Sequence, residues 1–212
     1  FPAVDSLVTF TNGGAGDSPV LEQIEALDWT RPAPGGHDSV YQRWYGSNGG
    51  GEDFTAGEQP FDPNRPTVLE SAGGRSGRIT LPYFNVLDAV YNGSGLTYGP
   101  GGVSVAVGWS GNWNATLALD EKAKTLHLTA GLAKTHLVLH AGESIRTARM
   151  VTLSWTGDRV DAQNQWRRLM LRFYTPQAAA GKDLALPATL AEGGATCDAR
   201  VAQLKAMSDA KI

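Results

Sequence analysis

The sequence predicts an all-β domain in which two sheets pack face to face, followed by an amphipathic helix. Short strand-like runs recur through the middle of the chain at intervals of about ten residues, a spacing typical of β-sandwiches. The 212 residues include 26 glycines and 11 prolines, which favours many tight turns between such strands. At residue 161 the apolar period changes from two to that of a helix, which ends the β pattern.

The first part of the chain mixes short strands with turn-rich segments. Residues 7–10 form a β-type run, and residues 20–29 have apolar positions that fit either a strand or a short helix. Residues 30–78 contain most of the Gly-Gly, Pro and Asp/Asn turn signals, with one aromatic-rich strand predicted at residues 40–45. We therefore expect long loops that cross the sheet edges in this region.

The strand pattern is clearest after residue 79. Val103, Val105 and Val107 alternate with small residues, which is the period of two expected of a strand with one face against a core. The small residues on the other face would let a further layer approach closely. Comparable strands are predicted at residues 115–119, 125–130, 136–140 and 149–155.

Residues 161–174 are predicted to form an amphipathic helix. Asp161 is the expected N-cap, and Pro176 prevents the helix from continuing. The apolar positions at i, i+3, i+4 and i+7 define one packing face, made of Trp166, Leu169, Met170 and Phe173. After a link of small residues, the pattern predicts a strand at residues 183–190 and a helix at residues 198–211.

Composition and charge exclude some classes of partner. The net charge of -3 provides no basic field for phosphates, so nucleic acid is not expected as a partner. No run approaches the roughly 18 apolar residues that a membrane-spanning helix needs, so no membrane partner is expected either. Cys197 is the only cysteine, which excludes an internal disulfide and is best explained as an ordinary small residue. The compartment stays open, because a signal peptide before Phe1 would not be visible here.

Three residues near the end of the β region are candidate metal ligands. His136 and His140 would lie on the same face of a predicted strand, and Glu143 follows in the next turn. Val138 shares that face, and no partner cluster occurs elsewhere in the sequence. An ordinary strand is the better interpretation, and we predict no metal and no cofactor.

Two tryptophans flank the short polar segment Ser110-Gly111-Asn112. Indole faces can stack on a sugar ring while neighbouring polar groups bind its hydroxyls. Trp109 continues the inward series that begins at Val103, which favours a place in the core. For Trp113 the sequence leaves core packing and sugar stacking equally open.

The loop at residues 43–54 combines aromatic rings, hydroxyl-binding groups and glycines, which suits contact with a carbohydrate as well as it suits a solvated loop. The aromatic and hydroxyl-binding groups are those of Trp44, Tyr45, Ser47, Asn48, Glu52 and Asp53. Glu52 and Asp53 are adjacent and would point to opposite sides of an extended backbone, so they cannot act as a paired acid and nucleophile across one bond.

Three segments of the chain, residues 101–113, 135–150 and 161–176, resemble the N-terminal β-domain of the glycoside hydrolase family 36 (GH36) α-galactosidases. The most specific parts are Gly-Trp-Ser-Gly-x-Trp at residues 108–113 and Gly-Glu-x-Ile-Arg-Thr at residues 142–147. Further similarity lies at residues 18–28, 45–54 and 77–86, so the resemblance covers most of the chain.

This resemblance implies a large two-sheet β-supersandwich, similar to galactose mutarotase, at residues 1–160. Residues 161–182 would be a linker helix and connection, and residues 183–212 the first βα unit of a truncated (β/α)8 barrel. The family's two catalytic aspartates perform a retaining double displacement and belong to later barrel strands. The resemblance therefore implies that this chain contains no catalytic residue.

The function implied is that of a non-catalytic domain that supports the barrel and contributes a loop to its substrate pocket. By resemblance Asp53 is the residue carried over as substrate-binding, with Trp44 and Trp113 as weaker additions. The expected partners are an α-galactoside, bound through the full-length enzyme, and the chain's own barrel. A stand-alone carbohydrate-binding module and a purely structural or oligomerisation domain remain alternatives, and a homo-oligomer stays open.

Overall fold

The computed structural model describes residues 1–33, 35–36, 39–91, 96–175 and 196–209. The chain divides into two compact units, Phe1–Leu169 and Met170–Ile212, which are described separately. Among the described residues, the first unit contains all the strands and most of the first helix. The strand predicted at residues 183–190 lies outside the described residues.

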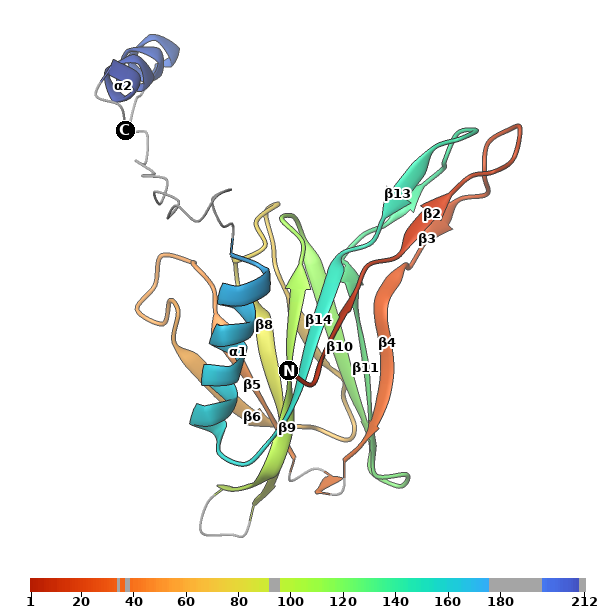
Figure 1. Ribbon diagram of the computed structural model, residues 1–212, viewed down its shortest axis with the longest axis vertical. Helices are drawn as coiled ribbons and strands as arrows, with labels where there is room; N and C mark the ends of the chain where they lie inside the picture. Colours follow the sequence, from red (N-terminus) through yellow and green to blue (C-terminus); the bar gives the residue numbers. More distant parts are fainter. Residues whose placement is uncertain (34, 37–38, 92–95, 176–195, 210–212) are drawn as a thin grey trace. The chain divides into compact units, whose positions relative to one another are not determined.

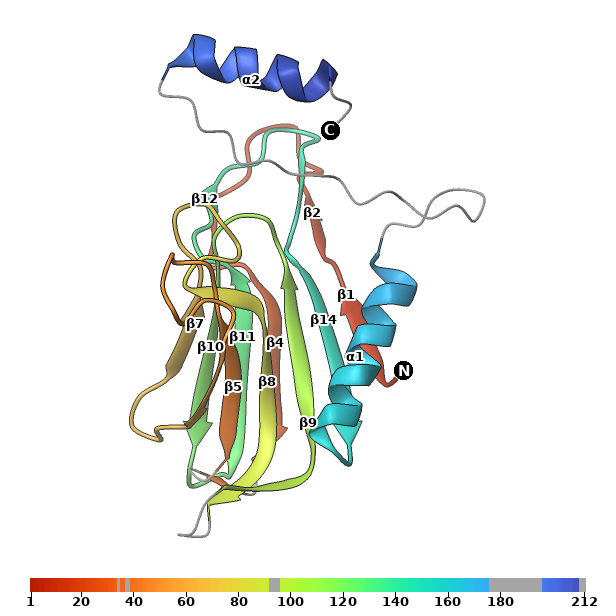
Figure 2. The same cartoon turned by 90° about the vertical axis from the view of Figure 1, so that its left-hand side faces the viewer.

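The first unit is a sandwich of two antiparallel sheets (Figures 1 and 2). The six-stranded sheet has the order β1 (Ala3–Ser6), β14 (Arg149–Thr156), β9 (Leu96–Gly108), β8 (Thr80–Tyr91), β5 (Val40–Tyr45) and β6 (Ala56–Pro60). The four-stranded sheet has the order β4 (Glu25–Pro32), β11 (Thr125–Leu132), β10 (Trp113–Asp120) and β7 (Thr67–Glu70). This architecture confirms the predicted all-β sandwich.

Two short ribbons extend beyond the end of the sandwich (Figure 1). One pairs β3 (Leu21–Glu22) with β12 (His136–Leu137), and the other pairs β2 (Thr9–Thr11) with β13 (Ser144–Arg146). Each ribbon joins residues from the start of the chain to residues more than a hundred positions later. We call the two ribbons together the arm.

The core lies between the two sheets because strands from both turn one apolar face inward. Val103, Val105 and Val107 of β9 are buried, as the alternating pattern predicted. On the facing sheet, β10 alternates buried and half-buried residues along its whole length. Each fully buried valine or leucine contributes about 1.5–3 kcal/mol relative to exposure, so this two-sided burial dominates the stability of the domain.

A helix, α1 (Arg159–Phe173), covers the outer face of the six-stranded sheet (Figure 2). Its Ala162 packs with Trp155 and Leu87, and the sheet residue Ser104 is only 1% exposed. The small residues of β9 thus allow another layer to approach, as the sequence indicated. The structure corrects the predicted N-cap: the Asp158 carboxylate accepts the Val160 amide at 2.7 Å, so the helix begins before Asp161.

The predicted packing face of α1 is only partly confirmed. Leu169 is 4% exposed and Trp166 is half-buried, but Phe173 is 60% exposed. In a helix the period alone identifies a stripe of residues, and the extent of the neighbouring sheet decides how much of that stripe is covered.

Three other sequence predictions change in the structure. Residues 30–78 are not only loops, because β6 and β7 lie within them. The ambiguous segment at residues 20–29 is extended and contains β3 and the start of β4. The strand predicted at residues 136–140 is limited to the two residues of β12.

The second unit contains α2 (Cys197–Asp209), which agrees with the predicted helix over the described residues. Thr196 precedes it, and its hydroxyl accepts the Ala199 amide at 3.2 Å, as an N-cap does. Cys197 is exposed and unpaired by any disulfide. Among the helices of the described ranges, none is long and apolar enough to cross a membrane.

Candidate functional site

The candidate loop joins β5 to β6 and is held by backbone hydrogen bonds to the loop before β8. Gly46 donates to the Ile79 carbonyl at 2.9 Å, and Ser47 donates to the Gly77 carbonyl at 2.9 Å. At the other end of the loop, the Phe54 amide donates to the Tyr45 carbonyl at 3.1 Å. These contacts make residues 46–54 an ordered turn, which we call the β5–β6 loop.

Asp53 stabilises the β5–β6 loop through its own carboxylate. Oδ1 accepts the Asn48 amide at 2.8 Å, and Oδ2 accepts the Gly49 amide at 2.9 Å. The hydrogen bond from the Asn48 amide is the main cause that lowers the pKa of Asp53 below its ordinary value, so the group stays anionic. Each carboxylate oxygen keeps a further lone pair, and the half-buried Asp53 can therefore still accept hydrogen bonds from a ligand.

Phe54 lies beside Asp53 in sequence but does not pack under it. Its ring is 61% exposed and its backbone has a φ of 63°, a left-handed conformation that is unusual for an aromatic residue. The exposed ring instead adds apolar surface next to the acidic group.

Trp44 belongs to an aromatic row on the outer face of the six-stranded sheet. Its ring centroid lies 4.8 Å from that of Tyr83, and the Tyr83 ring lies 4.9 Å from that of Trp166 on α1. Burial raises the pKa of Tyr83. Trp44 is half-buried in this row, so one part of the indole packs against Tyr83 while another part meets solvent.

Trp113 is enclosed in the core between the sheets. Its side chain is 0% exposed, and its Nε1 donates to the Ser76 carbonyl at 2.8 Å. No indole face is left for a sugar, so the proposed stacking role of Trp113 is contradicted. Trp109 is half-buried against the same core, as the sequence favoured.

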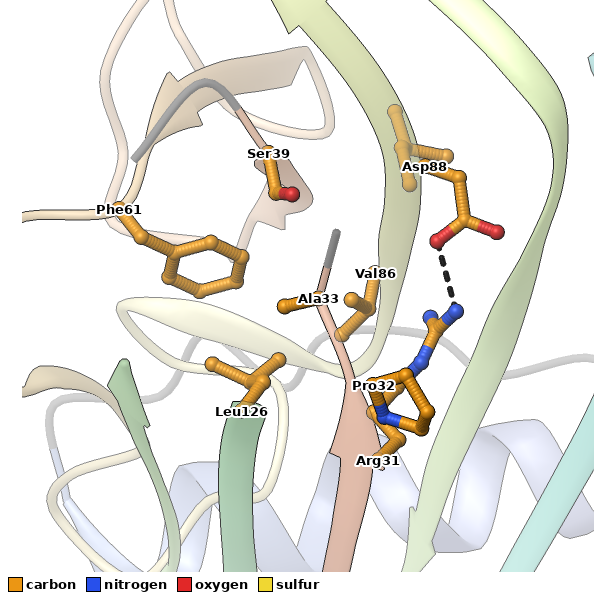
Figure 3. A pocket seen from close by; sticks show the side chains of 9 residues that line it. Arg31, Pro32, Ala33, Ser39, Phe61, Val86, Asp88 and Leu126 are labelled. Atoms are coloured by element: carbon orange, nitrogen blue, oxygen red, sulfur yellow. Dashed lines mark hydrogen bonds and ion pairs between the residues drawn. The ribbon is translucent and has the colours of Figure 1, made fainter. Parts of the chain in front are cut away.

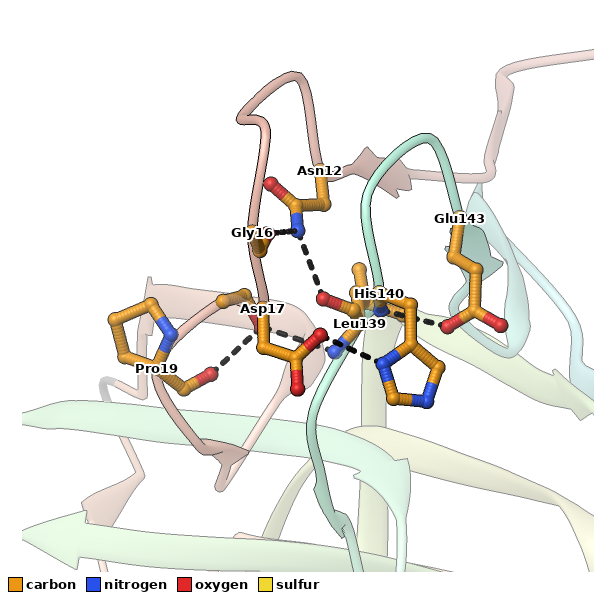
Figure 4. Close-up of polar contacts among 8 residues, drawn as sticks. Asn12, Gly16, Asp17, Pro19, Leu139, His140 and Glu143 are labelled. Carbon is orange, nitrogen blue, oxygen red and sulfur yellow. Dashed lines mark hydrogen bonds and ion pairs between the residues drawn. The ribbon is translucent and has the colours of Figure 1, made fainter.

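The three residues considered as metal ligands each have another partner, and Figure 4 shows the contacts of His140 and Glu143. His136 Nδ1 lies 3.0 Å from the Glu22 carboxylate, and His140 Nδ1 lies 2.7 Å from that of Asp17. Glu143 accepts the backbone amide of His140 at 2.7 Å. Among the described residues, no three His, Cys, Asp or Glu side chains form a group that could hold a metal ion.

The pair of His140 and Asp17 predicts a pH dependence of the arm. The hydrogen bond and the charge of Asp17, followed by the charge of Glu143, raise the pKa of His140. A raised folded-state pKa gives stability that is complete below the ordinary value of about 6.5 and is lost as pH rises through the raised pKa. We expect Asp17→Asn to lower the pKa of His140 toward its ordinary value in an NMR titration.

Glu22→Gln is the matched control, because Glu22 pairs with His136 instead. An unchanged His140 pKa in the Asp17→Asn variant, or an equal fall in both variants, would show that the pair drawn in Figure 4 does not persist in solution.

Two clefts lie away from the β5–β6 loop, and the sequence analysis identified neither. One, of about 730 Å³, lies at the base of the arm and is lined by Glu22, Glu25, Lys134 and His136 among others. The other, of about 310 Å³, lies beside the ion pair of Arg31 and Asp88, whose atoms are 2.6 Å apart. Figure 3 shows this ion pair at the rim of the apolar core. Arg31 and Asp88 are 57 residues apart, so no local pattern in the sequence could have predicted that they form a pair.

Solved structures with a similar arrangement were found, whereas no protein-family model and no curated protein sequence matches the chain. The α-galactosidase from Lactobacillus brevis has a TM-score of 0.62 and 12% identity, over 80% of this chain and 21% of that one. The GH36 α-galactosidase AgaA from Geobacillus stearothermophilus, in complex with raffinose, has a TM-score of 0.57 and 17% identity, over 74% of this chain and 20% of that one.

The β-domain shares its fold with GH36 α-galactosidases. The galactosidase domain of the α-galactosidase-sucrose kinase AgaSK gives the same result, with a TM-score of 0.57 and 16% identity over 74% of this chain. This chain spans about a fifth of the length of these GH36 structures. The resemblance read from the sequence is thus confirmed at the level of the fold.

The structure brings together only two of the three predicted site residues. Trp44 and Asp53 belong to the same hairpin, which β5 and β6 form. Trp113 begins β10 of the other sheet and points into the core. The candidate site therefore consists of the β5–β6 loop with the half-buried indole of Trp44 at its base.

Proposed function

We propose that this chain is the non-catalytic N-terminal domain of a retaining α-galactosidase-like glycoside hydrolase. The single observation that carries the proposal is the fold match, which covers most of this chain but about a fifth of each enzyme. The remaining four-fifths of such an enzyme would supply the (β/α)8 barrel and its two catalytic carboxyl groups. The likeness to galactose mutarotase and the start of the barrel at residues 183–212 are parts of the same proposal.

In this proposal the sandwich supports the barrel and the β5–β6 loop reaches its substrate pocket. Asp53 has the chemistry for this role, because a carboxylate that stays ionised is a strong acceptor for sugar hydroxyls. Its two bonds to the Asn48 and Gly49 amides fix its orientation before substrate binds, which reduces the entropy lost on binding. The exposed part of Trp44 offers an apolar surface in the same hairpin.

The test is Asp53→Ala in the enzyme that contains this chain. We expect kcat/KM for an α-galactoside to fall by about tenfold or more, which corresponds to about 1.4 kcal/mol of lost interaction with a charged acceptor. Steady-state kinetics with raffinose as substrate measure this change. Asp53→Asn should recover part of the loss, because its side-chain oxygen can still accept one amide.

The matched control is Asp120→Ala. Asp120 also accepts two backbone amides, from Lys122 and Ala123 at 2.9 Å each, but in the turn between β10 and β11. If the two alanine variants lowered kcat/KM equally, Asp53 would only stabilise its loop and would not bind substrate. Hydrolysis of raffinose by the 212-residue chain itself would contradict the non-catalytic assignment.

A further inference from the structure

We propose that the cleft beside Arg31 and Asp88 is a binding site for a neutral saccharide ring, separate from the β5–β6 loop. The register of β5 and β8 places it far from that loop, because Tyr45 pairs with Thr80 at the loop end whereas Val40 pairs with Leu87 at the opposite end. Asp88 follows Leu87 and lines the cleft. The site belongs to this chain alone and is independent of the proposed role of Asp53.

Both sheets contribute to the walls of the cleft. Trp29 and Arg31 come from β4, which is the edge strand of the four-stranded sheet. They are two residues apart and therefore share one face of that strand. The opposite wall is formed by the backbone of Gly101 and Gly102 in β9 and by Ser154 in β14. The volume of about 310 Å³ is at the lower end of the range for small-ligand sites, roughly 300–1,000 Å³.

The charges of the cleft favour a neutral and hydroxylated ligand. Arg31 Nη2 donates to Asp88 Oδ1 at 2.6 Å, so the two charges compensate each other and attract neither an anion nor a cation strongly. Arg31 Nη1 is buried and has no hydrogen-bond partner among the described residues. A purely apolar ligand would remove water from this ion pair and would offer no hydrogen bonds in place of those that the water made.

A sugar ring matches the remaining chemistry. Each hydroxyl both donates and accepts, so neighbouring hydroxyls can bond a carboxylate and a guanidinium at the same time. Trp29 packs partly against the core, and the rest of its half-buried indole lines the cleft, where it gives apolar surface for the C–H face of the ring. The glycines let β9 approach its neighbours closely at this wall, since a Cβ at Gly101 would lie 3.5 Å from Asp88 Oδ2 and 2.8 Å from the Trp155 carbonyl.

The experiment titrates the 212-residue chain with raffinose and follows the indole N–H signals by NMR. We expect saturable shifts of the Trp29 signal, and Trp29→Ala should weaken binding by about tenfold or more. Trp29→Phe keeps an aromatic plane and should retain most of the affinity, which guards against a variant that fails because of misfolding. Trp109→Ala removes another half-buried indole and should leave binding unchanged.

Three outcomes would overturn the proposal. The first is the absence of saturable shifts in the unchanged chain, and the second is saturable binding of inorganic phosphate at Trp29 in place of raffinose. The third is raffinose binding that Asp53→Ala abolishes and Trp29→Ala leaves intact, because the sugar would then occupy the β5–β6 loop. That last result would support the proposed function while removing this second site.

Discussion

Trp113→Ala should remove a large part of the equilibrium stability of the β-domain. The substitution removes the largest fully buried side chain of the described core, which leaves a cavity and deprives the Ser76 carbonyl of its hydrogen-bond donor. Large-to-small changes of Trp in a core reduce the free energy of unfolding by about 3–5 kcal/mol, against a total of about 5–15 kcal/mol for a typical domain. Urea denaturation followed by circular dichroism measures the loss.

Two variants separate the cavity from other causes. Trp113→Phe keeps much of the volume and loses the hydrogen bond to Ser76, so its free energy of unfolding should fall by about half as much or less. Trp109→Ala acts on a half-buried ring and should also be the milder change. A loss below about 1 kcal/mol for Trp113→Ala would mean that the indole does not lie between the sheets in solution.

Gly46→Ala should disorder the β5–β6 loop. An ideal Cβ at Gly46 would lie 2.0 Å from the Gly77 carbonyl oxygen, a contact with backbone that no side-chain rotation can relieve. The two segments must separate, which breaks the hydrogen bond from Ser47 to Gly77. We expect a loss of about 3 kcal/mol or more in the free energy of unfolding, measured by denaturant titration.

The control in the same loop is Gly51→Ala, where nothing lies within 4 Å of the added Cβ. This variant should change the free energy of unfolding by less than about 0.5 kcal/mol. In the enzyme that contains this chain, Gly46→Ala should also reduce kcat/KM if the loop reaches the substrate pocket. Equal stabilities for the two variants would contradict the close approach of Gly46 to Gly77.

The sandwich could be predicted because the central strands show a clear alternation of apolar and small or polar residues in their own sequences. The alternation at Val103, Val105 and Val107 requires one buried face whatever the rest of the chain does. By contrast, β6 has the sequence Ala-Gly-Glu-Gln-Pro, whose composition resembles a loop. It is a strand because β5 lies beside it as a partner, with Tyr41 opposite Gln59. Tertiary pairing thus overrides a weak local preference.

The candidate site shows the same division between local and long-range causes. The family resemblance identified Asp53, with Trp44 as a weaker addition, but the bonds from the Asn48 and Gly49 amides depend on a loop geometry that no spacing rule contains. For Trp113 the sequence allowed either core or surface, and the alternating burial of β10 decides for the core. The cleft at Arg31 and Asp88 requires the two sheets to be placed face to face before it exists.

The arm has a consequence for the order in which the chain acquires its structure. Thr9–Thr11 pairs with Ser144–Arg146, so the earlier strand waits for a partner that is translated more than 130 residues later. At about 5–20 residues per second, that delay is on the order of ten seconds. Contacts of such high sequence separation also slow refolding, because closing the intervening segment is entropically unfavourable. The arm should therefore be among the last parts of the domain to gain hydrogen-exchange protection, together with β1, whose Ala3 pairs with Leu153.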